Sequence, residues 1–239
     1  RDHGFDAAVL QAPVVIADGI RGTHEQEVRQ RGEHFDTCYL AGEIAAADSM
    51  LVLSHVTGHR LAGFGGALKN LAMGCASRQG KMRQHCATGP VIHGDKCRAC
   101  WACLNVCPAE ALSREEDRVR LLPERCTGCG QCLSVCPEGA VRPGWDRGGR
   151  DFLEGMGEYA AAALSLFSRP VLHLNFLLDI TPGCDCEKHT APPLCPDLGI
   201  AASFDPVALD RASLDLINQA LQSAPDSVEQ KDARLERHH

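Results

Sequence analysis

The chain has 239 residues, of which 44% are hydrophobic and 23% are charged, and its formal net charge at pH 7 is −7. Because its Lys and Arg residues are scattered and not gathered in stripes, this composition argues against nucleic acid as a partner. No apolar run reaches the ~20 residues of a membrane-spanning helix, so no membrane span is predicted.

The sequence predicts one α/β domain, a mostly parallel sheet with flanking helices, that is interrupted by a separate module. Pro- and Gly-rich boundaries mark the ends of that module. The chain begins at Arg1 without an initiator Met, so we expect its first part to be incomplete. The predicted division is residues 1–88 and 146–222 for the α/β domain, 89–145 for the inserted module, and 223–239 for a disordered tail.

The first part of the chain alternates apolar runs with helical segments, which is typical of a sheet covered on both faces. Strands are predicted at 14–17, 37–41 and 50–56, helices at 43–48 and 67–76, and a polar helix or loop at 25–31. A Gly-rich turn at residues 63–66 precedes the second helix.

The last part of the chain continues this alternation. Apolar residues recur at helical spacing from Leu153 to Phe167, and Pro170 ends that helix. Strands are predicted beyond it at 171–178 and 199–203. A final helix starts at Asp205, because Asp caps free N–H groups and the following Pro206 fits the first turn.

Eight of the fourteen cysteines form two copies of the pattern C-x-x-C-x-x-C-x-x-x-C-P. The first copy runs from Cys97 to Pro108, and the second runs from Cys126 to Pro137. This pattern holds cubane iron–sulfur clusters in bacterial-type ferredoxins. Three thiolates spaced by two residues bind one cluster, whereas the fourth cysteine lies on a short helix and binds the other cluster.

The inserted module is therefore predicted to be an α+β dicluster ferredoxin-like module with two [4Fe–4S] clusters. Its ligands are Cys97, Cys100, Cys103 and Cys136 for the first cluster, and Cys126, Cys129, Cys132 and Cys107 for the second. A zinc ribbon usually offers separated C-x-x-C pairs, and neighbouring C-x-x-C thiols close strained disulfide rings, so both alternatives fit the two runs less well.

Three segments outside the cysteine runs resemble the family called domain of unknown function 362. They are HRLAGFGGALKNLAMG at 59–74, NFLLDITPGCDC at 175–186 and DLGIAASFDPVALD at 197–210. The resemblance covers most of the chain, and many members of this family carry the same inserted ferredoxin. It implies an iron–sulfur protein, often called a ferredoxin by default, with no established substrate.

A second group of polar residues stands near the ends of predicted strands, where α/β sheets usually place ligand sites. The candidate residues for a second metal or substrate site are Cys184, Cys186, His189, Cys195, His55, His59 and Lys69. Two thiolates one residue apart suit zinc or iron, and Lys69 suits an anionic substrate. The alternative is a structural loop; buried cysteines such as Cys75 and Cys86 are expected in a protein core.

Paired cubanes move single electrons, so the leading hypothesis is an electron-transfer protein, either a ferredoxin-like carrier or the electron-input module of an oxidoreductase. Redox proteins would be its partners. A second hypothesis is a redox enzyme whose α/β domain binds a small molecule or metal and receives electrons from the clusters. A third is an iron–sulfur sensor or scaffold. The many reduced thiols predict a reducing cytoplasm.

Overall fold

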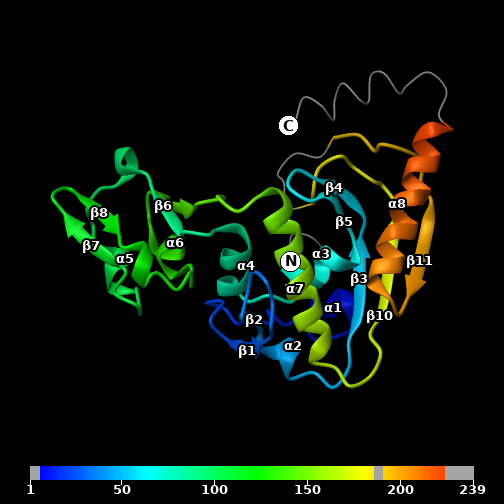
Figure 1. Cartoon of the computed structure of the whole chain (residues 1–239), viewed down its shortest axis with the longest axis horizontal. Coiled ribbons are helices and arrows are strands. Elements are labelled where there is room, and N and C mark those ends of the chain that lie inside the picture. The colour runs from blue at the N-terminus through cyan, green and yellow to red at the C-terminus, as the bar shows by residue number, and fades with distance from the viewer. Residues whose placement is uncertain (1–5, 186–190, 224–239) are drawn as a thin grey trace. The chain divides into compact units, whose positions relative to one another are not determined.

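The computed structural model describes residues 6–185 and 191–223 (Figure 1). The chain divides into two compact units. Unit 1 comprises Arg1–Arg29, Thr37–Ala47 and Cys75–Asp146, and unit 2 comprises Gln30–Asp36, Asp48–Gly74 and Arg147–His239. Apart from Ser223, the predicted tail lies outside the described residues. None of the helices in the described ranges has the length and hydropathy needed to cross a bilayer.

Unit 2 is built on a three-stranded sheet. Its strands lie in the order β11 (Gly199–Ser203), β10 (Leu172–Leu177), β3 (Leu51–His55). The three strands are confirmed at their predicted places. The sheet is mixed, however, where a mostly parallel sheet was predicted, because β10 pairs parallel with β3 but antiparallel with β11. The parallel pair brings the carboxyl ends of two strands to the same edge.

Helix α8 (Pro206–Gln222) covers one face of this sheet and contacts both β10 and β11. Asn175 and Leu177 alternate along β10 and are fully buried on the covered face. The helix begins as predicted, since the Asp205 carboxylate accepts hydrogen bonds from two N–H groups of the first turn.

Unit 2 also contains two short strands, two short helical segments and one long helix. They are β4 (Thr57–His59), β5 (Gly63–Gly65), α3 (Ala67–Lys69), the π-helix Asn70–Gly74 and α7 (Gly149–Ser165). Helix α7 has the predicted amphipathic pattern, buries Phe152 and Tyr159, and packs against the π-helix. The ring of Phe35 meets that of Tyr159 edge-on at 5.1 Å.

The first part of unit 1 contains an antiparallel pair and three helices. These are β1 (Glu25–Arg29), β2 (Thr37–Ala41), α1 (Ala7–Leu10), α2 (Gly42–Ala45) and α4 (Arg78–His85). Two predictions are wrong here. Residues 14–17 are coil and turn and are mostly exposed, whereas 25–31 contain strand β1. Its polar residues are held by pairing with β2 and by Glu25, which accepts a hydrogen bond from Ser77.

The cysteine runs lie in a small repeated structure within unit 1. Its elements are β6 (Pro90–Ile92) paired with β9 (Val141–Pro143), β7 (Leu112–Glu115) paired with β8 (Arg118–Leu121), and the short helices α5 (Ala102–Asn105) and α6 (Gln131–Val135). A 3-10 turn precedes each run, at Gly94–Lys96 and Pro123–Arg125. The repeat in the sequence is therefore also a repeat in the backbone.

Candidate functional site

Two cavities in unit 1 are lined by cysteines, and the two runs exchange one cysteine between them. The first cavity is lined by Cys97, Cys100, Cys103 and Cys136, and the second by Cys107, Cys126, Cys129 and Cys132. They contain about 360 Å³ and 340 Å³ of space free of protein atoms. Each cavity thus gathers three thiols of one run and the fourth thiol of the other run.

Left-handed backbone turns shape each run. In the first run Ala99 and Trp101 have φ values of 52° and 62°, and in the second run Gly128 and Gly130 have values of 74° and 68°. These residues lie between successive cysteines of the same loop. The turns let the chain fold around each cavity, and Gly adopts this conformation without the steric cost that other residues incur.

The fourth cysteine of each run accepts a backbone hydrogen bond. The N–H of Ala111 donates to Cys107 Sγ and that of Ala140 donates to Cys136 Sγ, with an N–S distance of 3.2 Å in both cases. Hydrogen bonds to ligand sulfurs are one of the means by which proteins adjust the potential of an iron–sulfur cluster.

Three thiols of these cavities are harder to ionise than a free cysteine. Burial is the main reason that the pKa of Cys132 is raised to about 12, and the thiols of Cys129 and Cys126 raise it further. Burial also raises the pKa of Cys103 and of Cys126. Crowded thiols in an apolar cavity disfavour thiolates, and metal ions supply the missing positive charge.

None of the described cysteines is in a disulfide. In the described ranges, no three His, Cys, Asp or Glu side chains converge in the manner of ligands to a single ion. A cubane makes a different demand, because its four cysteines each bind a separate iron and therefore surround a volume. The two cysteine-lined cavities meet that demand in the type and number of their donors.

The two cavities differ in charge and exposure. Lys96, Arg98 and Glu138 line the first cavity, and Arg98 pairs with Glu138 at an N–O distance of 2.7 Å. Cys100 of this cavity is exposed. The second cavity is lined by cysteines, by Thr127 and by apolar or small residues. Charged residues therefore line the first cavity and not the second.

Helix α4 lies against the turns of the second cavity, a contact that the sequence did not predict. A Cβ atom added at Gly130 would lie 3.2 Å from Met82 Cγ and 3.3 Å from Arg78 Cγ. A Cβ added at Gly128 would lie 3.3 Å from Arg83 Cγ. These two glycines thus allow α4 to pack closely against the second run, in addition to adopting the left-handed conformation of its turns.

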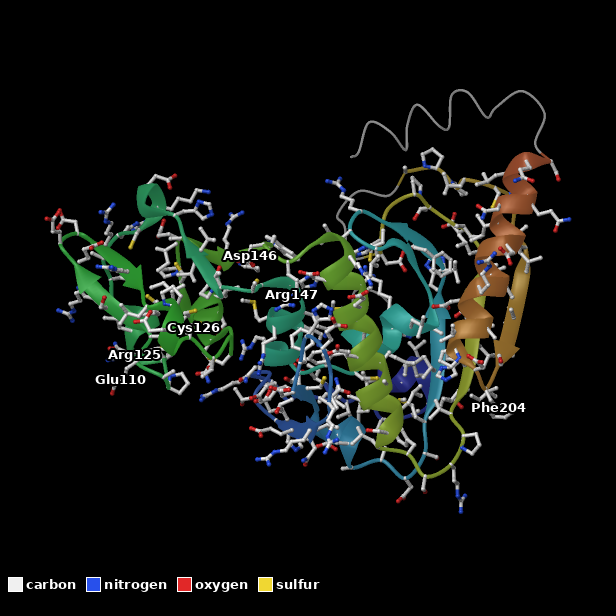
Figure 2. The ribbon with its side chains drawn as sticks, in the orientation of Figure 1. Glu110, Arg125, Cys126, Asp146, Arg147 and Phe204 are labelled. Carbon is white, nitrogen blue, oxygen red and sulfur yellow. The ribbon has the colours of Figure 1, made fainter. Side chains whose placement is uncertain are left out.

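Cys86, at the end of α4, is buried as predicted for a core cysteine. It accepts a hydrogen bond from the N–H of Gly144 and lies near enough to Cys126 to raise the pKa of that thiol. Asp146 accepts hydrogen bonds from the N–H groups of the segment after α4. Figure 2 labels Cys126 and Asp146.

A third cavity, of about 620 Å³, lies in unit 2 at the carboxyl end of the parallel strands. Its lining includes His55, Lys69, Asn70, Cys184 and Asp185. The Lys69 ammonium donates to the Cys184 sulfur, with an Nζ–Sγ distance of 2.9 Å. We call this the Lys69–Cys184 pocket.

Both ring nitrogens of His55 have partners in this pocket. Nδ1 lies 2.7 Å from a carboxylate oxygen of Asp185, and Nε2 lies 2.7 Å from the carbonyl oxygen of Leu178. Burial lowers the pKa of His55, but the hydrogen bonds to Asp185 and Leu178 outweigh it, and the net shift is upward. An imidazolium satisfies both acceptors, so His55 fits a cation better than a metal ligand.

The structure brings only part of the second candidate site together. Lys69, Cys184 and His55 line one pocket. The ring of His59 instead stacks on Phe152, and its Nδ1 accepts a backbone hydrogen bond. Cys195 packs in an apolar core cluster. Cys186 and His189 lie outside the described residues.

The start of helix α3 does not bind an external anion, because a carboxylate of the chain occupies it. Asp210, from α8, accepts hydrogen bonds from the N–H groups of Ala67 and Leu68 at 2.7 and 2.9 Å. The Gly-rich turn at residues 63–66 leads directly into this helix. These two donors are already satisfied inside unit 2.

The model of a family described as "Domain of unknown function (DUF362)" matches residues 1–215 of the chain. No curated protein matches the chain.

Proposed function

The chain belongs to the DUF362 family, and from that premise we propose that it is an iron–sulfur electron-transfer protein of the branch with an inserted dicluster ferredoxin. One observation carries the proposal. Each of two cavities is lined by four cysteines, three from one run and one from the other. This exchange is the arrangement that two-cluster ferredoxins use to hold two [4Fe–4S] clusters.

The residues of unit 1 have separate roles in this proposal. The eight cysteines bind the clusters, which supply two one-electron centres when present. The N–H groups of Ala111 and Ala140 donate to ligand sulfurs and stabilise added negative charge. The exposed Cys100 places the first cavity at the surface, where a redox partner protein can approach.

Iron and sulfide analysis with EPR tests the proposal. Protein purified without oxygen is expected to contain about eight iron and eight sulfide per chain. Dithionite should bleach its visible absorbance reversibly and produce the EPR signal of reduced clusters. Protein that stays colourless and iron-free after anaerobic reconstitution would contradict the proposal, and zinc without sulfide would favour the ribbon alternative.

The Lys69–Cys184 pocket favours a second candidate function, a redox enzyme whose α/β part binds a substrate. A carrier has no need of a cavity of about 620 Å³ in which a buried thiol is paired with a lysine. In this candidate the clusters of unit 1 deliver electrons to chemistry in unit 2. Substrate-dependent reoxidation of the reduced protein, lost in Cys184→Ser, would distinguish an enzyme from a carrier.

A further inference from the structure

We propose that the Lys69–Cys184 pocket binds a small anionic electrophile, with the Cys184 sulfur as the nucleophile and Lys69 as the cation that receives the anionic group. This inference concerns unit 2 alone and goes beyond electron transfer. It rests on the placement of the thiol, on the charges beside it and on the cavity in front of it.

The thiol has the partner that a nucleophile needs. Lys69 Nζ donates to Cys184 Sγ at 2.9 Å, and a neighbouring cation stabilises the thiolate, which is the reactive form of cysteine. Cys184 is only 6% exposed, yet it lines the cavity.

The loop before Cys184 is held in place by close packing. A Cβ added at Gly58 would lie 2.1 Å from the carbonyl oxygen of Pro182, so only Gly allows this approach. The N–H of Gly58 donates to the carbonyl of Thr181, and the Thr181 hydroxyl donates to the carbonyl of Gly183. The sulfur is thereby fixed at the wall of the cavity before any ligand binds.

The charges of the pocket favour an anionic electrophile. Lys69 contacts the Cys184 sulfur, and His55 contacts the carboxylate of Asp185. In the proposed reactive form, with Cys184 as a thiolate, Lys69 and a protonated His55 each have one counter-charge. A reaction at sulfur removes the charge of the thiolate and leaves one cation without its counter-charge. An anionic group on the ligand restores the balance, and Lys69 has three N–H donors with which to hold it.

Iodoacetate is a probe that matches this chemistry. The Cys184 thiolate attacks the methylene carbon, an S–C bond forms, the C–I bond breaks, and iodide leaves with the electron pair. The carboxylate of the probe remains beside Lys69. Iodoacetamide is the neutral control, since it has the same leaving group and nearly the same size.

The experiment measures alkylation of Cys184 by mass spectrometry in the full chain with its metal content intact. The ratio of the iodoacetate rate to the iodoacetamide rate is expected to exceed that of a cysteine in a short peptide by about tenfold, which corresponds to ~1.4 kcal/mol. Lys69→Met should abolish this preference, and Lys69→Arg should keep it. The exposed cation Arg60 offers the control Arg60→Met, which should change nothing.

Three results would overturn the proposal. The first is a Cys184 that resists both reagents in the folded chain but reacts once unfolded. The second is a preference that persists in folded Lys69→Met or, where that variant does not fold, in Lys69→Gln. The third is bound zinc or iron that is lost in Cys184→Ser. None of these results depends on the eight cysteines of the two runs, because the iron that they bind is measured separately.

Discussion

Asn175 and Asp210 meet in the interior of unit 2, where the Asn175 amide donates to the Asp210 carboxylate at an N–O distance of 2.8 Å. The same carboxylate accepts the N–H groups of Ala67 and Leu68. One side chain of α8 thus joins the central strand β10 to the start of α3, the helix that carries Lys69.

Asp210→Ala is expected to destabilise unit 2 by about 3 kcal/mol, because the N–H groups of Ala67 and Leu68 and one N–H of the Asn175 amide lose their acceptor. Asp215→Ala is a matched control on the same helix. Asp215 forms an exposed pair with Arg211, and its loss should cost about 0.5 kcal/mol. Urea unfolding followed by far-UV circular dichroism measures both losses of stability. Equal losses in the two variants would show that the buried carboxylate does not stabilise unit 2 as proposed.

The exchange of cysteines between the runs predicts an unusual pattern in double variants. Cys107→Ser should remove one cluster and lower the iron content from about eight to about four per chain. Adding Cys126→Ser should cause no further loss, because Cys107 and Cys126 line the same cavity. Adding Cys97→Ser instead should remove the remaining iron, because Cys97 lines the other cavity.

Iron analysis and EPR of the reduced variants check this pattern, with Cys38→Ser as the control for a buried cysteine outside the runs. If Cys107 completed the cluster of its own run, the two double variants would give the opposite results.

The repeat offers a comparison of two residues in the same left-handed conformation. Glu110, labelled in Figure 2, has a φ of 49°, and Gly139 occupies the corresponding place after the second run with a φ of 58°. Gly139→Ala should destabilise unit 1 by about 1 kcal/mol, because a Cβ is unfavourable there. Glu110→Gly should be neutral or stabilising, since the relief of strain offsets the entropy of glycine.

Gly157→Ala is the control, because Gly157 lies within helix α7, where an added Cβ meets open space. This change should stabilise unit 2 by about 1 kcal/mol. Denaturant unfolding of the three variants measures whether each change raises or lowers the free energy of unfolding. A stabilising effect of Gly139→Ala would show that the left-handed backbone at this position does not require glycine.

The pair of His55 and Asp185 predicts a dependence of stability on pH. The pKa of His55 is raised in the folded chain, so the folded state holds its proton more tightly than the unfolded state does. The resulting stabilisation is fully present below about pH 6.5, the ordinary histidine pKa, and is lost as the pH rises through the higher folded value.

NMR titration of His55 measures this shift directly. Asp185→Asn should lower the pKa of His55, and His55→Gln should remove the loss of unfolding free energy that accompanies a rise in pH above about 6.5. An unchanged pKa in Asp185→Asn would show that the carboxylate does not hold the proton on the ring.

Local patterns predicted much of the fold. Strands β3, β10 and β11 follow from apolar runs, and the start of α8 follows from Asp205 and Pro206. The apolar residues 14–17 have a strand-like composition but form none, because composition does not supply a pairing partner. Strand β1 is polar, and only its pairing with β2 reveals it.

The sequence predicted the lining of the cysteine cavities more fully than that of the pocket in unit 2. The spacing of the runs assigns every cysteine to the cavity that it lines. Lys69 and Cys184 could be named as candidates, but their contact depends on long-range packing. Asp185 and Asp210 lie in segments that resemble the family, but no local pattern identifies their partners, which are distant in the chain.

The exchange of cysteines between the two runs also has a consequence for biosynthesis. A ribosome delivers Cys97, Cys100 and Cys103 early, but Cys136, the last residue that their cavity requires, emerges after the entire second run. A nascent or truncated chain that ends between the runs therefore lacks the full set of four cysteines for either cavity. In the proposed function, the first cluster can assemble only after the whole repeat has been synthesised.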